Sequence, residues 1–442
     1  MHFDRSLLPS GFASIEHDII TPTLHDNLFE QVLAATNLDL AWQRVKANKG
    51  SAGVDGMSID DFPKYAQENW DAIKAELING TYRPQPALRV EIPKPDGGKR
   101  LLGIPTVIDR IIQQAIHQVL NPIFDPEFSA HSYGFRPGRN AAQAVKHIQA
   151  CIKLGHKIAV DVDLSKFFDR VDHDLLMHKL GCKINDKALM RLIGKYLRAG
   201  VVDKGERVRT QEGVPQGSPL SPLLSNIMLD ELDKTLEKRG HCFARYADDF
   251  TILVKSHRAG QRVLTNISVF LQRKLKLVVN EDKSRVGSVK ETKFLGFSFK
   301  RGKIQIHDKA LVKFKQQVRR LTNRNWGIAM KKQIIHLNRY LRGWGNYFFI
   351  ANAYQLSVDL DHWVRRRIRM CYWRQWRRPR TKVRSLLKRG VPERLAISCG
   401  ITSKGPWRSS KTKGINMALT NQYLKDEGLI ALRDIWIKVH HG

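Results

Sequence analysis

Two adjacent aspartates, Asp248 and Asp249, stand in the stretch HCFARYADDFTILV, between two apolar runs that have the pattern of β-strands. Acids are depleted in strands, and neighbouring like charges repel each other. A turn alone would explain a bare pair of aspartates, because this side chain bonds to nearby backbone in turns. At the tip of a hairpin, however, both carboxylates can point toward one place. Such a pair could hold a cation.

A third acid, Asp163, ends another short apolar strand in KIAVDVD, residues 157–163. If the two strands pair, we expect Asp163 to meet Asp248 across the sheet. Clustered carboxylates need cations, and hard oxygen ligands suit Mg²⁺, whereas the chain offers no His/Cys set for zinc. Two such ions can stabilise the attacking and leaving oxygens of a phosphoryl displacement. The three acids therefore predict nucleotidyl transfer.

The charge balance predicts a polyanionic partner. The 442 residues include 75 Lys and Arg against 42 Asp and Glu, a net charge of +33. Nucleic acid is the simplest partner for such a chain, and an anionic membrane is the competing one. Since no apolar run approaches ~18 residues, we expect no membrane contact. Five scattered cysteines without a C-x-x-C pair, and the lack of a secretory signal, favour a reducing, cytoplasmic setting.

The surrounding elements suggest an α+β core with a helical, basic extension. Apolar spacing predicts helices over 26–48 and 106–124, and another that starts at Ser221 or Pro222 and follows a loop. Two strands joined by the turn PDGG are expected over 88–104. A further helix is expected over roughly 258–276, and a strand over 294–299. Beyond about residue 303 acids become scarce, and arginines and aromatics mix. A chain of this length implies two or three subdomains.

Seven segments together resemble the motifs of reverse transcriptases. The most telling is RYADDF, which is similar to their Y-x-D-D box. The others, in chain order, are IPKPDGGKRLLGIP (92–105), SYGFRPGR (132–139), DLSKFFD (163–169), VPQGSPLSPLLSN (214–226), LVVNEDKS (277–284) and FLGF (294–297). The chain most resembles the group II intron-encoded reverse transcriptase/maturase of the compact class C type. Its tail, 405–434, is similar to the end of those proteins, and the Cys- and His-rich nuclease domain of some relatives is not expected.

The resemblance implies a right-hand polymerase fold of the α+β class. Fingers and a palm with an antiparallel sheet would be followed by an α-helical thumb and a small basic C-terminal DNA-binding region. The expected divisions are an N-terminal extension (1–50), fingers and palm (51–302), the thumb or maturase domain (303–375) and the DNA-binding region (376–442).

The resemblance also assigns roles around the three acids. Asp163 and Asp248 would bind two Mg²⁺ ions, for which Mn²⁺ could substitute, together with the backbone carbonyl of Leu164; Asp249 would be an accessory ligand. Lys283 would protonate the leaving pyrophosphate.

The remaining implied sites bind nucleotide and nucleic acid. Each also has a purely structural explanation: Lys94 and Arg100 could be solvated charges of a hairpin, Phe168 a core residue, and FLGF an ordinary buried strand. The dNTP site would comprise Lys94, Arg100, Phe168, Gln216 and Gly217, with Phe168 excluding a 2′-OH. The primer grip would comprise Phe294, Leu295 and Gly296.

Four arginines in the expected thumb are crowded within two helical turns. Arg365, Arg366, Arg367 and Arg369 repel one another, and we expect phosphates to relieve that repulsion. The neighbouring aromatics Trp363, Tyr372, Trp373 and Trp376 could stack on bases or simply pack in a core.

The expected protein is an RNA-directed DNA polymerase that binds its group II intron RNA. It would promote splicing and copy the intron by target-primed reverse transcription, with dNTPs and target DNA as further partners, in a bacterial cytoplasm near the nucleoid. Whether it is a monomer or a dimer is open. The alternatives are a domesticated reverse transcriptase in DNA repair or phage defence, and a splicing-only RNA-binding maturase; the intact acids argue against the last.

Overall fold

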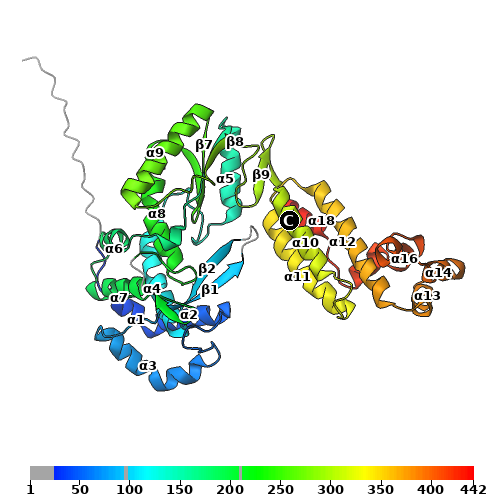
Figure 1. Ribbon diagram of the computed structural model, residues 1–442, viewed down its shortest axis with the longest axis horizontal. Helices are drawn as coiled ribbons and strands as arrows, with labels where there is room; N and C mark the ends of the chain where they lie inside the picture. Colours follow the sequence, from blue (N-terminus) through cyan, green and yellow to red (C-terminus); the bar gives the residue numbers. More distant parts are fainter. Residues whose placement is uncertain (1–23, 94–97, 209–211) are drawn as a thin grey trace, which may run out of the picture. The chain divides into compact units, whose positions relative to one another are not determined.

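The computed structural model describes residues 24–93, 98–208 and 212–442 (Figure 1). The chain divides into two compact units that interleave along the sequence. The first combines the chain up to Phe124 with Phe168–Met228, and the second combines Asp125–Phe167 with Leu229–Gly442. Each is described by itself below.

The first unit is built on a mixed sheet and a buried helix. Its strands lie in the order β2-β1-β4-β5, in which β1 pairs antiparallel with β2 and parallel with β4. This confirms the two paired strands expected over 88–104, whereas most of the turn PDGG expected between them lies outside the described residues. The strands are β1 (Ala87–Pro93), β2 (Lys99–Ile104), β4 (Val201–Asp203) and β5 (Glu206–Val208).

Helix α4 (Val107–Phe124) packs against the two helices at 28–33 and 35–48 through an apolar face whose residues recur at helical spacing. Val107, Ile111, Ile112 and Ile116 are all buried on that face. The helices are α1 (Leu28–Leu33), α2 (Ala35–Asn48), α3 (Phe62–Ile78), α4 (Val107–Phe124), α6 (His173–Gly181) and α7 (Lys187–Arg198), and α8 (Ser221–Lys238) starts here and ends in the second unit. The pattern over 26–48 yields two helices rather than one, because the extended backbone of Ala34 (ψ 134°) interrupts it.

The second unit contains an antiparallel sheet of four strands in the order β6-β7-β3-β8. Helix α5 packs against β6, and helix α9 packs against β3 and β8. The elements are α5 (Ala141–Lys153), β3 (Ile158–Val162), β6 (Cys242–Tyr246), β7 (Asp249–Val254), α9 (His257–Leu275) and β8 (Arg285–Ser288), with a short 3₁₀ turn at Asp125–Glu127; a second such turn, Phe167–Asp169, leads from this unit into the first. The predicted hairpin around the paired aspartates is confirmed.

A helical region continues the second unit from a small hairpin onward. One hydrophobic core runs from residues of α5 and the sheet, such as Ile148 and Leu253, through Phe314 and Leu360 to Leu432 near the C-terminus. The elements are β9 (Phe297–Lys300), β10 (Lys303–Ile306), α10 (Asp308–Leu321), α11 (Met330–Phe348), α12 (Tyr354–Gln375), α13 (Pro379–Leu387), α14 (Glu393–Gly400), α15 (Pro406–Ser409), α16 (Lys413–Ala418), α17 (Asn421–Asp426) and α18 (Leu432–His441).

Candidate active site

The two adjacent aspartates lie at the tip of the β6–β7 hairpin. Tyr246 pairs with Asp249, so Ala247 and Asp248 form a two-residue connection between the strands. Ala247 has a φ of 60°, a left-handed conformation that is uncommon for a residue with a side chain. Asp248 is therefore a turn residue, and Asp249 is the first residue of β7.

Strand β3 brings Asp163 to the same end of the sheet. The predicted pairing of the two strands is confirmed, since β3 and β7 are antiparallel with Val162 opposite Phe250. Continuing this register by one residue places Asp163 opposite Asp249, and not opposite Asp248 as the sequence suggested. The backbone N–H of Asp163 donates to Ser284 Oγ at 3.0 Å, and its carbonyl accepts from Asn280 N–H at 2.8 Å.

A fourth acid, Asp161, belongs to this cluster. Its carboxylate accepts a hydrogen bond from Thr251 Oγ1 at 2.9 Å and lies 3.6 Å from Arg285 Nε. Burial raises the pKa of Asp161, while Thr251 and Arg285 act in the opposite direction. Sequence reasoning did not identify this residue. The available signal was its spacing, because residues i and i+2 of a strand point to the same face and Asp161 stands two positions before Asp163.

Burial and the neighbouring acids both act on the pKa of Asp249. Burial, followed by the negative charges of Asp248 and Asp161, raises this pKa to about 7. The residue also keeps an exposed face, so water screens part of this repulsion. A cation beside the cluster would lower this pKa again, because it favours the ionised carboxylates.

Carboxylate oxygens are hard ligands of the kind that divalent cations such as Mg²⁺ prefer, and a bound cation would relieve the repulsion between them. They do not form a ready-made cage: within residues 24–93, 98–208 and 212–442, no group of three or more His, Cys, Asp or Glu side chains is close enough to hold a metal ion. Lys283, predicted to act here, lies beside the cluster with its Nζ 3.7 Å from Asp163 Oδ2. Leu164, whose carbonyl was a predicted ligand, is buried next to Asp163 and bridges to Val279.

A buried arginine lies beneath the hairpin. Arg245, on β6, is fully buried, and its guanidinium donates to both carboxylate oxygens of Asp233 on α8 at 2.5–2.9 Å. It also donates to Ser132 Oγ at 2.8 Å and to the carbonyl of Ala247 at 3.0 Å. The ion pair thus ties the left-handed residue before Asp248 to the interior of the second unit.

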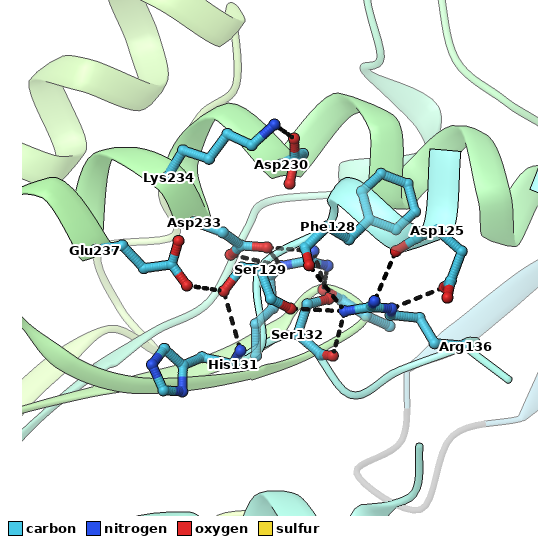
Figure 2. Close-up of polar contacts among 12 residues, drawn as sticks. Asp125, Phe128, Ser129, His131, Ser132, Arg136, Asp230, Asp233, Lys234 and Glu237 are labelled. Atoms are coloured by element: carbon cyan, nitrogen blue, oxygen red, sulfur yellow. Dashed lines mark hydrogen bonds and ion pairs between the residues drawn. The ribbon is translucent and has the colours of Figure 1, made fainter. Parts of the chain in front are cut away.

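The segment SYGFRPGR supports the same hairpin from below. Tyr133 N–H donates to the carbonyl of Arg245, and a Cβ at Gly134 would collide with the backbone nitrogen of Ala247, so only glycine fits there. Figure 2 shows Arg136 pointing at Asp125, whose Oδ1 accepts at 2.8 Å, and at the carbonyls of Ser129 and Ser132. The resemblance gave this motif no role; the structure makes it a support for the turn that carries Asp248.

The described residues of the predicted dNTP site lie in the first unit. The carbonyl of Gln216 accepts from Gly103 N–H on β2 at 2.7 Å. Gly217 has a φ of 110°, and a Cβ there would lie 2.9 Å from the Gly103 carbonyl. Arg100 is exposed on the same strand, opposite Ile92. Phe168 is half-buried, whereas its neighbour Phe167 fills the core. Lys94 lies outside the described residues.

The predicted primer grip is a tight turn rather than the start of a strand. Phe294 and Phe297 exchange backbone hydrogen bonds at 2.9 and 3.1 Å, and both residues between them, Leu295 and Gly296, have positive φ values of 51° and 85°. Strand β9 therefore begins at Phe297, and not at 294 as expected. Phe294 is fully buried, while Tyr347 Oη donates to the Leu295 carbonyl at 3.0 Å.

Three of the four predicted phosphate-binding arginines have partners inside the protein. Arg367 donates to the carbonyl and hydroxyl of Thr322, which ends α10. Arg366 donates to the carbonyl of Trp407 and stacks on its ring at 3.5 Å.

Arg369 reaches the Leu419 carbonyl, at the end of α16. Arg366, Arg367 and Arg369 thus donate to backbone carbonyls at the ends of helices, where the carbonyls carry partial negative charge. The phosphate-binding role of the four remains a prediction. Arg365 Nε is buried without a hydrogen-bond partner among the described residues. Of the nearby aromatics, Tyr372 and Trp373 pack in the core.

Comparisons with known proteins identify two parts of the chain. Residues 92–299 match the family described as reverse transcriptase (RNA-dependent DNA polymerase), and residues 311–390 match the group II intron, maturase-specific domain. Within the described part of the chain, no helix is long and apolar enough to cross a membrane.

Two curated relatives and one solved structure illustrate the similarity. Protein YkfC of Escherichia coli (strain K12) is 34% identical over 56% of this chain and 74% of its own length. The group II intron-encoded protein LtrA of Lactococcus lactis subsp. cremoris is 30% identical over 62% of this chain, which spans 56% of LtrA. The structure titled "Partial Cas6-RT-Cas1--Cas2 complex" is 26% identical over 56% of this chain and 43% of that chain, with a TM-score of 0.36.

Proposed function

Because this chain belongs to the group II intron-encoded reverse transcriptases that carry a maturase-specific domain, we propose that it copies RNA into DNA and binds the RNA of its intron. It would promote splicing of that RNA and copy it from a primer at the DNA target. The observation that carries the polymerase assignment is the convergence of β3 and the β6–β7 hairpin, with Asp163 opposite Asp249 and Asp248 in the adjoining turn.

The acids would bind two Mg²⁺ ions, for which Mn²⁺ could substitute. When bound, these ions would activate the primer hydroxyl and neutralise charge on the leaving pyrophosphate. Asp163 and Asp248 are the proposed principal ligands, with the Leu164 carbonyl and Asp249 as further ones. Lys283 Nζ, 3.7 Å from Asp163, would hold a proton beside the cluster and transfer it to the departing oxygen.

The incoming nucleotide would contact the first unit. The Arg100 guanidinium suits the triphosphate, and the Gly217 backbone permits close approach. The half-buried ring of Phe168 would exclude a 2′-OH. We expect Phe168→Ala to raise rNTP incorporation at least about tenfold relative to dNTP incorporation, because the excluding ring is removed. Steady-state incorporation of single nucleotides measures this ratio; an unchanged ratio would remove Phe168 from the proposed site.

Binding of intron RNA is proposed for the region matched by the maturase domain, residues 311–390. The splicing chemistry would belong to the RNA, and the protein would stabilise the RNA fold. A splicing assay with the intron RNA tests this part separately, since a chain that copies RNA without accelerating splicing would be a reverse transcriptase alone.

Primer extension on an RNA template tests the polymerase assignment. We expect Asp248→Asn to lose at least about a hundredfold in rate, because a charged ligand is removed from the site where charge develops. Asp71→Asn, on the exposed face of α3, is the matched control and should extend primers as the parent does. Extension that survives Asp248→Asn would contradict the assignment. A parent chain that binds intron RNA but extends no primer would point to a splicing-only factor.

A further inference from the structure

A hollow opens in the helical region of the second unit, between the end of α10, the middle of α12 and the short helix α15. Its volume is about 510 Å³. Three arginines and two tryptophans dominate its wall: Arg319 and Arg324 from the α10 end, Arg367 and Trp363 from α12, and Trp407 from α15.

The positive charge of this hollow is not neutralised by acids. The lining contains no Asp or Glu, and in the part of the chain that the structure describes none of the three arginines forms an ion pair with a carboxylate. Burial lowers the pKa of Arg367, and the charges of Arg319 and Arg324 lower it further. Three cations that repel one another around a concave surface favour an anion at its centre.

The wall is also held in place before any ligand arrives. Arg367 donates through Nε to Thr322 Oγ1 at 2.9 Å, and the guanidinium of Arg366 covers the ring of Trp407 at 3.5 Å. Arg319 lies 5.8 Å from the centre of the Trp363 ring. Such contacts limit the rotamer freedom that binding would otherwise have to remove.

Guanidinium groups beside indole rings suit a ligand that carries both a phosphate and a flat ring. A hollow of this volume lies within the range of sites for single small ligands. A base inside a duplex is stacked and paired, so it cannot enter a hollow, whereas a base in a bulge, a loop or a single strand can be turned outward.

We propose that this hollow binds one unpaired nucleotide of a nucleic-acid strand, with its phosphate between Arg319, Arg324 and Arg367 and its base against Trp363 and Trp407. The inference rests on the proposed function, because it takes nucleic acid as the ligand. It adds that the chain recognises an unpaired nucleotide specifically, in addition to the non-specific attraction of its basic surface for phosphates. RNA and DNA share the required chemistry.

The test compares binding of the full chain to hairpins that differ by one bulged nucleotide. One RNA pair and one DNA pair are used, and the bulged or corresponding paired position carries 2-aminopurine, whose emission falls when it stacks on an aromatic ring. We expect the parent to bind at least one bulged hairpin about tenfold more tightly than its paired counterpart and to quench its emission. The arm that shows this preference identifies the source as RNA or DNA.

The double variant Arg319→Gln/Arg324→Gln should lose that preference while its thermal unfolding stays unchanged, since both side chains are exposed. The matched control Arg377→Gln/Arg378→Gln removes the same charge from exposed positions outside the hollow. It should weaken bulged and paired hairpins equally, with a shallower salt dependence for both.

Three results would overturn the inference: no preference for a bulge in either parent arm, an equal loss for the two double variants, or no quenching. Primer extension by the parent chain is measured alongside. Extension without a bulge preference would contradict this inference and leave the proposed function standing. A bulge preference without extension would support this inference and contradict the proposed polymerase activity.

Discussion

Arginine is used in two opposite ways in the second unit. Beneath the β6–β7 hairpin, Arg245 is fully buried and its charge is matched by Asp233, which is also fully buried. Along α12, Arg366, Arg367 and Arg369 lie against backbone carbonyls, which accept hydrogen bonds but carry no full charge. The first arrangement is neutral, and the second stays positive.

The net charge of each arrangement fits the charge of the groups around it. The hairpin already carries clustered acids, and a neutral ion pair below it holds Ala247 without adding charge to the cluster. The α12 arginines join the ends of three helices and still leave a positive potential for phosphates. Arginine charge is therefore compensated near the acids and retained where a polyanion is expected to bind.

The largest effect is expected from breaking the neutral pair. Arg245→Met should lower the free energy of unfolding by about 3–5 kcal/mol, because it leaves the Asp233 carboxylate buried and unpaired. Urea denaturation followed by tryptophan fluorescence measures this. The double variant Arg245→Met/Asp233→Leu should recover most of the loss, since no buried charge remains; a double variant as unstable as the single one would contradict the argument.

A smaller effect is expected on α12. Arg369→Gln should lower the free energy of unfolding by about 1–3 kcal/mol, because the Leu419 carbonyl and Asn421 Oδ1 lose a charged donor while no opposite charge is left buried. The same denaturation series measures it. Arg374→Gln, on an exposed position of the same helix, should change stability by no more than about 0.5 kcal/mol. A loss at Arg369 as large as that at Arg245 would erase the contrast between the two regions.

The smallest effect concerns the acids above the neutral pair. The native pKa of Asp249, about 7, exceeds that of the unfolded chain, about 4, so the native state binds this proton more tightly. In EDTA, the stabilising contribution of the proton is therefore full below pH 4 and is lost as the pH rises to 7. After solvent screening we expect a change of about 1 kcal/mol across this window.

Asp249→Asn should remove this part of the pH dependence, whereas Asp71→Asn should retain it. Denaturation at pH 4 to 8 measures the difference. Identical pH profiles for the parent and Asp249→Asn would show that the acids do not interact in the folded chain.

Local pattern was sufficient to predict several elements but not their register. The hairpin at Asp248, the strand before Asp163 and helix α4 follow from alternation and helical spacing. One residue of register decided whether Asp163 faces Asp248 or Asp249, and that register depends on how the strands pair. The FLGF segment was expected to be extended because its apolar run matches a strand, yet two left-handed residues make it a turn.

The contacts that the sequence did not predict are made between residues far apart along the chain. Arg245 finds Asp233 on α8 and Ser132, which is 113 positions away along the chain. For the α12 arginines the sequence predicted phosphate partners only, because their carbonyl partners, 41 to 50 residues distant, carry no signature in the sequence. Burial of charged groups depends on tertiary contacts, so periodicity could not reveal it.

The continuous core of the second unit limits how the protein can be divided. The sheet region contributes Ile148 and Leu253, and the helical region contributes Phe314, Leu360 and Leu432, to one apolar interior. A cut after residue 302, at the proposed boundary between palm and thumb, would expose that interior on both fragments. In evolutionary terms, this shared interior favours keeping the maturase segment: even in a lineage that abandoned splicing, its helices would still cover apolar residues of the polymerase sheet.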